Sequence, residues 1–229
     1  MTLILHIETA VETASICLAK DGQVLALSSN TEQRDHAAWI HNAIQAMMDE
    51  AGFSMKELSA IAVSAGPGSY TGLRVGMASA KGLSFALQIP MISLNTLEIM
   101  ANAAITNWSI KGDINEYLFV PMIDARRMEV FTAIYDPQLK NILPPQAMVL
   151  DPDSFNGWLK DQPLIFFGNG HGKCRNIITH YNAQFKDLPF SARDMVTLAY
   201  DEFQEGKFAD LAYSEPFYTK GFYTPAKKI

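Results

Sequence analysis

A glycine-rich turn at residues 66–74 contains the groups best suited to binding chemistry. The turn follows an apolar run at residues 60–65, typical of a parallel strand buried on both faces, and it precedes a helical pattern over residues 73–87. Such a turn directs backbone N–H groups and the positive end of the helix dipole at one point, where an anion can bind. The candidate anion- or nucleotide-binding residues of this turn are Gly66, Gly68, Ser69, Thr71, Gly72 and Arg74.

The spacing within the turn matches none of the general nucleotide or nucleophile fingerprints. A P-loop needs Gly-Lys-Ser/Thr at its end, but Gly72 is followed by Leu73. Thr71 occupies the position of the last glycine in the GxGxxG pattern, and Ser69 directly follows Gly68, which excludes a GxSxG elbow. Two interpretations stay open: an anion or nucleotide site in a partnered state, or a tight turn needed only for packing.

The helix after the turn has small residues in two rows at four-residue spacing. Glycine in a helix interior costs about 1 kcal/mol relative to alanine, so each interior glycine needs a structural reason. One row can face the sheet of its own lobe and the other a second subunit; packing within the core alone is the alternative. The two rows are Gly72, Gly76, Ala80 and Ala78, Gly82, Ala86.

The first half of the chain reads as a three-stranded meander followed by helices and a buried strand. Asp21-Gly22 lies between two runs of strand formers and predicts a hairpin. Apolar residues at three- and four-residue spacing predict an amphipathic helix that ends at Gly52, and Ser54 caps a short helical turn. Strands are expected at residues 3–7, 14–18, 24–28, 60–65 and 91–93, and helices at 35–51, 73–87 and 96–104.

The second half repeats this pattern after a polar connection at residues 107–116. Asp151 as a cap and Pro152 at the first helical position predict a helix through Leu159. The duplication indicates an α/β protein of two lobes, residues 1–106 and a smaller 107–229, with mixed sheets flanked by helices; the last helix could return to the first lobe. Strands are expected at residues 118–123, 128–135, 147–150 and 164–167, and helices at 151–159, 174–179 and 194–205.

Composition narrows the class of protein. The 229 residues are 48% hydrophobic and 18% charged, which is ordinary for a globular chain, and the net charge of −6 argues against broad attraction to nucleic acid. Cys17 and Cys174 form no framework of disulfides, which favours a reducing cytoplasm. The N-terminus lacks the basic region of a signal peptide, and no apolar run approaches the ~20 residues that span a bilayer. We therefore expect a cytoplasmic protein without a membrane segment.

Several motifs resemble those of the TsaB family, also called YeaZ. The resemblance is highly specific over residues 61–76, which contain the glycine turn, and extends through Ala80-Lys81-Gly82-Leu83 and Ser93-Leu94-Asn95-Thr96-Leu97-Glu98. It continues in the first strand and in Ile123-Asp124-Ala125-Arg126-Arg127, covers roughly the first 135 residues well, and thins out afterwards. It implies an actin-like ATPase fold of two RNase H-like lobes.

The resemblance also implies a function and a set of partners. Members act in forming N6-threonylcarbamoyladenosine at position 37 of tRNAs that read ANN codons, as the non-catalytic companion of the transferase TsaD; the small ATPase TsaE joins the complex. ATP or ADP at the interface with TsaD is the candidate ligand, tRNA is reached only through the complex, and members pair as homodimers when TsaD is absent. The implied interface residues are His36, Trp39, Ile40, Ala43, Met47, Val75, Ala78, Ser79, Gly82, Phe85 and Ala86.

Other residues depart from what an enzyme of this fold needs. TsaD-like enzymes hold a metal through an H-x-x-x-H helix, but His36 and His41 are five apart and do not share a helix face, so we expect no metal site. Glu8 stands where many relatives have Asp, beside Thr9; both are nucleotide-site candidates, with a solvated acid at a strand end as the alternative for Glu8.

Arg126 and Arg127, which follow the strand expected at residues 118–123, suggest a structural role more than a binding role. Asp124, Arg126 and Arg127 are expected to form an internal ion pair at a strand end, with a contact to a partner or phosphate as the alternative. The rival functions for the whole chain are an independent ATPase of the actin or sugar-kinase type and a protease acting on a partner. A protease would need Ser or Cys near His and an orienting acid, and no spacing indicates that arrangement.

Overall fold

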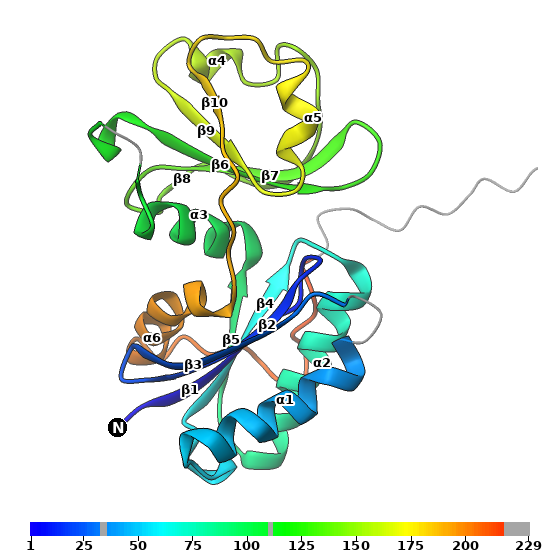
Figure 1. Ribbon diagram of the computed structural model, residues 1–229, viewed down its shortest axis with the longest axis vertical. Helices are drawn as coiled ribbons and strands as arrows, with labels where there is room; N and C mark the ends of the chain where they lie inside the picture. Colours follow the sequence, from blue (N-terminus) through cyan, green and yellow to red (C-terminus); the bar gives the residue numbers. More distant parts are fainter. Residues whose placement is uncertain (33–35, 110–111, 218–229) are drawn as a thin grey trace, which may run out of the picture.

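The computed structural model describes residues 1–32, 36–109 and 112–217, which form two five-stranded sheets, one in each lobe (Figure 1). The first sheet has the order β3-β2-β1-β4-β5, in which β1 to β3 are antiparallel and β4 and β5 run parallel to β1. Its strands are β1 (Leu3–Glu8), β2 (Ala14–Lys20), β3 (Gln23–Asn30), β4 (Ala60–Gly66) and β5 (Met91–Asn95).

The second sheet repeats this topology. Its order β10-β9-β6-β7-β8, read from β8, again places three antiparallel strands beside two parallel ones. The duplicated α/β fold of two mixed sheets predicted from the sequence is therefore confirmed. The strands are β6 (Leu118–Asp124), β7 (Glu129–Tyr135), β8 (Asn141–Val149), β9 (Leu164–Phe167) and β10 (Ala183–Phe185).

Local sequence signals explain turns and helix starts in the first lobe. Asp21 and Gly22 both have positive φ, as the predicted two-residue hairpin turn requires. Ser69 caps α2 (Tyr70–Leu87) by accepting from the Gly72 N–H, so this helix begins three residues earlier than its apolar pattern indicates. The other long helices are α1 (His36–Ala51) and α3 (Thr96–Thr106); residue 35, the predicted start of α1, lies outside the described residues.

Each face of the first sheet is covered by a different set of helices. α1 and α2 lie on one face, where their apolar residues join those of β1, β2 and β4 in one core cluster. The other face is covered by a 3₁₀ turn at Ala192–Met195 and by α6 (Val196–Gln204), which return from the second lobe to pack on β1 and β5. β1, β2 and β4 are thus buried on both faces, whereas the edge strand β3 is largely exposed.

α3 connects the lobes because it packs on both sheets. It contacts β4 and β5 of the first lobe and β6 and β7 of the second, where Leu97, Met100 and Ala104 join an aromatic-rich cluster. Figure 1 shows this helix between the two sheets. The far face of the second sheet carries α4 (Asn156–Leu159) and α5 (His171–Arg175).

Two predicted helices of the second lobe differ from the structure, and one strand was not predicted. The helix expected from Asp151 begins only at Asn156, because the Asp151 carboxylate accepts the Asp153 N–H and the Ser154 hydroxyl and forms a turn of its own. The helix expected at 174–179 spans His171–Arg175 instead. β10 was missed, since a three-residue strand has no periodicity to detect.

After α6, a C-terminal strap (residues 209–217) runs back along the first lobe. Ala209 pairs with Met91 at the β5 edge, and the Lys81 ammonium of α2 donates to the Ser214 carbonyl at 3.0 Å. The strap ends at the glycine turn, where the Phe217 N–H donates to the Ala65 carbonyl at 2.6 Å. Across the described ranges, no helix has the length and apolar character needed to cross a membrane.

Candidate functional site

The glycine turn is packed tightly against the residues that follow β1. The Ser69 N–H donates to the Ala10 carbonyl at 2.7 Å, and the Thr9 hydroxyl donates to the Gly72 carbonyl at 2.8 Å. A Cβ on Gly72 would lie 2.0 Å from the Thr9 carbonyl oxygen, and one on Gly68 would lie 2.4 Å from that of Ala10. These glycines are needed because backbone meets backbone, which supports the packing interpretation of the turn.

The C-terminal strap covers the turn from another side. Gly66 has φ +112°, a conformation that favours glycine, and a Cβ there would lie 2.8 Å from the Phe217 carbonyl oxygen. The Gly66 N–H donates to the Thr96 hydroxyl at 3.1 Å. The Gly66 and Ser69 N–H groups are therefore both occupied from within the chain and do not converge on an open anion site.

The candidate binding residues in and beside the turn differ in exposure. Thr9 and Gly72 are buried, whereas Ser69, Thr71 and Arg74 are exposed. The Arg74 guanidinium lies over the Tyr70 ring, 4.2 Å from its centroid. The structure therefore does not bring all the predicted binding residues to one surface, and nucleotide binding at the turn stays a prediction.

Glu8 is fully buried, so the interpretation of this residue as a solvated acid is wrong. One carboxylate oxygen, Oε1, accepts the Ala10 N–H at 2.7 Å and the Ser64 hydroxyl at 3.1 Å, while Oε2 has no partner in the described part of the chain. Burial raises the pKa of Glu8 to about 7, against the lowering effect of these hydrogen bonds. The side chain fixes the end of β1 and does not line the open cleft described below.

The two rows of small residues on α2 face opposite environments, as the sequence pattern suggested. Gly76 is buried, and a Cβ there would lie 2.3 Å from the Thr9 hydroxyl oxygen; a Cβ on Gly82 would meet nothing within 4 Å. The row of Ala78, Gly82 and Ala86 is exposed, and Phe85 beside it is 79% exposed. We call Ala78, Gly82, Phe85 and Ala86 the α2 face.

Four of the predicted interface residues lie too deep for a partner to reach. Ile40 and Met47 belong to the core that α1 forms with the first sheet, because its apolar stripe faces the strands. Ser79 is buried between the helices, where its hydroxyl lies 3.4 Å from His41 Nε2. The buried candidates are His36, Ile40, Met47 and Ser79, and the half-buried ones are Trp39, Ala43 and Val75.

A hollow of about 530 Å³ adjoins the α2 face at the end of the helix. It is lined by the last residues of α2, by Ile89 beyond it, and by Leu211 of the C-terminal strap. Phe85 is at its rim and exposed, and apolar atoms dominate its lining. An exposed aromatic beside an apolar hollow is typical of a protein-binding surface.

The expected ion pair of Asp124 has a different partner. Asp124 accepts from the Lys173 ammonium of α5 at 2.8 Å, and its contact with Arg126 is to the backbone N–H at 2.6 Å. Arg126 and Arg127 have φ +70° and +49° in the tight turn between β6 and β7, and within the described residues the salt bridge of Asp124 is to Lys173. Burial alone would raise the Asp124 pKa, but the Lys173 and Arg126 hydrogen bonds lower it.

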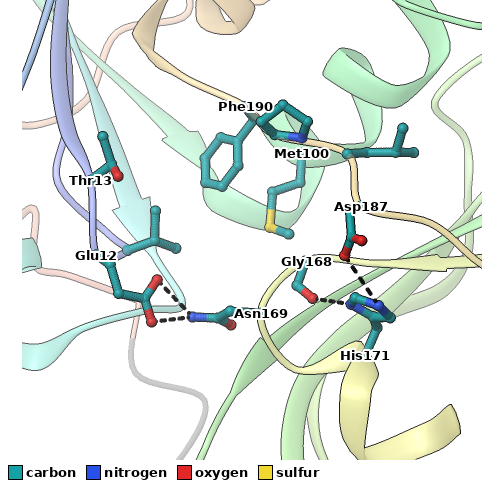
Figure 2. A pocket seen from close by; sticks show the side chains of 11 residues that line it. Glu12, Thr13, Met100, Gly168, Asn169, His171, Asp187 and Phe190 are labelled. Atoms are coloured by element: carbon teal, nitrogen blue, oxygen red, sulfur yellow. Dashed lines mark hydrogen bonds and ion pairs between the residues drawn. The ribbon is translucent and has the colours of Figure 1, made fainter. Parts of the chain in front are cut away.

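A cleft of about 500 Å³ lies between the lobes (Figure 2). Both carboxylate oxygens of Glu12, from the connection between β1 and β2, accept from the Asn169 amide at 2.8 and 3.0 Å. His171 Nδ1 lies 2.6 Å from the Gly168 carbonyl, and Nε2 lies 3.6 Å from the Asp187 carboxylate. The apolar walls are Val11, Met100, Leu188, Pro189 and Phe190.

The sequence did not identify the residues that line this cleft. Its lining comes from four separate segments of the chain. Glu12 and Asn169, which join the lobes, are 157 residues apart and have no local signal. Only the topology brings them together.

Comparisons of this chain with family models and with curated proteins agree on one family. The family model described as "TsaD: tRNA N6-adenosine threonylcarbamoyltransferase" matches residues 23–214. The tRNA threonylcarbamoyladenosine biosynthesis protein TsaB of Escherichia coli is 31% identical over 225 residues, 95% of this chain and 94% of that protein. TsaB of Bacillus subtilis is 31% identical over 174 residues, 72% of this chain and 70% of that protein.

Solved structures agree with the sequence relatives. A Pseudomonas aeruginosa protein described as similar to peptidase YEAZ superposes with a TM-score of 0.82 at 26% identity, over 96% of this chain and all of that one. A structure described as YeaZ from the same organism gives 0.78 at 27% identity, over 95% of this chain and all of that one. From its glycine turn, its duplicated sheets and these relatives, the chain belongs to the TsaB (YeaZ) family.

Proposed function

We propose that this chain acts in the formation of N6-threonylcarbamoyladenosine at position 37 of tRNAs reading ANN codons, as a non-catalytic partner of TsaD. The names of its TsaB relatives support the pathway. The partner role rests on one observation: α2 presents an exposed row of small residues beside Phe85, although its other small row is buried against Thr9. Small side chains let a partner helix approach closely, and the exposed ring supplies an apolar anchor.

The proposed assembly has further members, which the resemblance to the family implies. TsaD docks on the α2 face with the exposed flank of α1, and the same face forms a homodimer when TsaD is absent. TsaE joins the complex, ATP or ADP binds at the interface with TsaD, and tRNA is reached only through the complex. The net charge of −6 supports this last point, because an acidic chain attracts RNA poorly on its own. The assembly works in the cytoplasm.

An independent ATPase is the less favoured function. Such an enzyme needs a carboxylate on the first strand that reaches Mg²⁺ and phosphate, but Glu8 is buried and bonded to Ser64 and Ala10. We expect no ATP turnover by the isolated chain. Turnover that Glu8→Ala abolishes would support the ATPase and contradict the partner role.

The proposal is tested by titrating TsaD into this protein with and without ATP, followed by light scattering and nucleotide occupancy. We expect a defined complex with the wild-type chain, and at least tenfold weaker binding for Gly82→Leu, since the added side chain enlarges the α2 face. The matched control is Gly157→Leu, because Gly157 is also an exposed helical glycine with nothing within 4 Å of its Cβ position, but lies in the second lobe. Absence of a complex with ATP at low salt would refute the proposal.

A further inference from the structure

The residues that line the interlobe cleft belong neither to the glycine turn nor to the α2 face. Its walls are apolar, with Phe190 and Met100 facing the space above Glu12 (Figure 2). Its polar rim carries two carboxylates, Glu12 and Asp187, and the Asp187 side chain is 92% exposed. A ligand for this cleft should therefore combine apolar or aromatic groups with positive charge.

The residues that follow the C-terminal strap have that composition. Residues 218–229 contain three lysines, Lys220, Lys227 and Lys228, and no Asp or Glu. They also contain three aromatic residues, Tyr218, Phe222 and Tyr223. Their charge is thus opposite to that of the cleft rim, and their rings suit its walls.

The strap delivers this segment close to the cleft. The Phe217 N–H donates to the Ala65 carbonyl, and the Phe217 carbonyl lies beside Gly66. The next residues of the turn, Gly68 and Ser69, pack on Ala10. Ala10 directly precedes the cleft residues Val11 to Thr13. Twelve residues can span up to ~40 Å when extended, so the segment has ample length to cross this turn and enter the cleft.

We propose that the cleft between the lobes is a docking site for the chain's own residues 218–229. The wall formed by Met100 and Phe190 offers an apolar surface suited to the aromatic residues of the segment, and Glu12 and Asp187 offer carboxylates suited to its lysines. Because the cleft residues come from both lobes, docking there adds a contact between the lobes to those made by α3 and by the Glu12–Asn169 pair. High salt weakens the docking, since its lysine contacts are at the rim.

Amide hydrogen exchange tests the proposal on the full chain and on a chain that ends at Phe217. We expect exchange at Val11–Thr13 and Leu188–Phe190 to rise several-fold in the shorter chain, with exchange in β4 unchanged because the Phe217–Ala65 bond remains. A full-length variant with the three lysines changed to Glu should show the same rise. Unchanged exchange at the cleft in both variants would overturn the proposal.

A peptide of residues 218–229 provides a second measurement. It should bind the chain that ends at Phe217 and not the full chain, whose cleft is already occupied. Asp187→Lys in the shorter chain should weaken peptide binding at least threefold, whereas Asp201→Lys, an exposed acid on α6, should not. Binding that is equal with and without residues 218–229 would show that the segment does not fill the cleft of the full chain and would refute the proposal.

Discussion

His6 and Glu8 lie two residues apart on β1, and burial acts on them in opposite directions. Desolvation lowers the pKa of His6 to about 4 and raises that of Glu8 to about 7. Below pH 4.5 Glu8 is protonated in the folded and unfolded states alike, so its effect appears only as the pH rises. Between 4.5 and 7 the folded chain holds a proton that the unfolded chain has lost, and stability falls.

His6 produces the opposite slope in nearly the same window. The unfolded imidazole binds a proton below about 6.5, but the folded one binds it only below about 4, so stability rises as the pH increases between these values. The two groups therefore largely offset each other. The wild-type chain should show a flatter pH dependence than either group alone would cause.

Glu8→Gln separates the two contributions. The free energy of unfolding of Glu8→Gln minus that of the wild type should increase by about 3 kcal/mol between pH 4.5 and pH 7, since a shift of one pKa unit is worth about 1.4 kcal/mol. Urea denaturation across this range measures it, and the difference cancels the His6 term. A difference that does not change with pH would mean that Glu8 ionises normally in the folded chain.

Sequence could reveal where Glu8 lies but not its environment. The apolar run of residues 3–7 predicted β1, and the resemblance identified Glu8 as unusual. Its hydrogen-bond partner Ser64 is 56 residues away on β4, so neither the burial nor the unpartnered Oε2 had a local signal. The partner of Asp124 was missed for the same reason, because Lys173 is 49 residues distant.

At the scale of elements, α2 shows how well periodicity predicts orientation. Two rows of small residues four apart left two interpretations open, and the structure has the one with a buried row and an exposed row. Hairpin and cap chemistry was equally readable: the Asp21-Gly22 turn and the capping box of Ser54 with Glu57 depend on adjacent residues. Asp151-Pro152 gave a wrong start for the helix that begins at Asn156, because the same residue types that start helices also form turns.

Alanine at the two kinds of glycine on α2 should give opposite results. Gly72→Ala places a Cβ against the Thr9 carbonyl and should destabilise the chain by about 3 kcal/mol or more, the upper part of the range for overpacking. Gly82→Ala should stabilise it by up to about 1 kcal/mol, because alanine favours the helix and has open space.

Chemical denaturation of the two variants measures both effects. A loss of stability for Gly82→Ala would mean that its Cβ meets a neighbour, and an unchanged Gly72→Ala chain would mean that β1 and α2 separate easily. Gly157→Ala in α4 is the control for the intrinsic effect of replacing an exposed helical glycine.

At the scale of the molecule, the first lobe is completed by a segment that follows the second lobe in the sequence. The sequence suggested a division between residues 106 and 107, which stays a prediction, with the last helix free to return to the first lobe. In the structure Ala192, Met195, Val196 and Ala199 cover β1, β4 and β5 from the far end of the chain. Composition and periodicity could place α6 on the chain but not on a sheet, since an amphipathic helix fits either lobe.

This arrangement predicts that residues 1–106 will not fold cooperatively alone. Without the 3₁₀ turn and α6, one face of the first sheet loses its cover, and each Å² of apolar surface exposed costs about 25 cal/mol. A fusion of residues 1–106 to residues 189–217 through a Gly/Ser linker should restore a cooperative thermal transition by circular dichroism. Both fragments leave the same side of α3 uncovered, so their difference isolates the returning segment. If residues 1–106 alone melt as cooperatively as the fusion, the first lobe is an independent folding unit and the returning helix is dispensable.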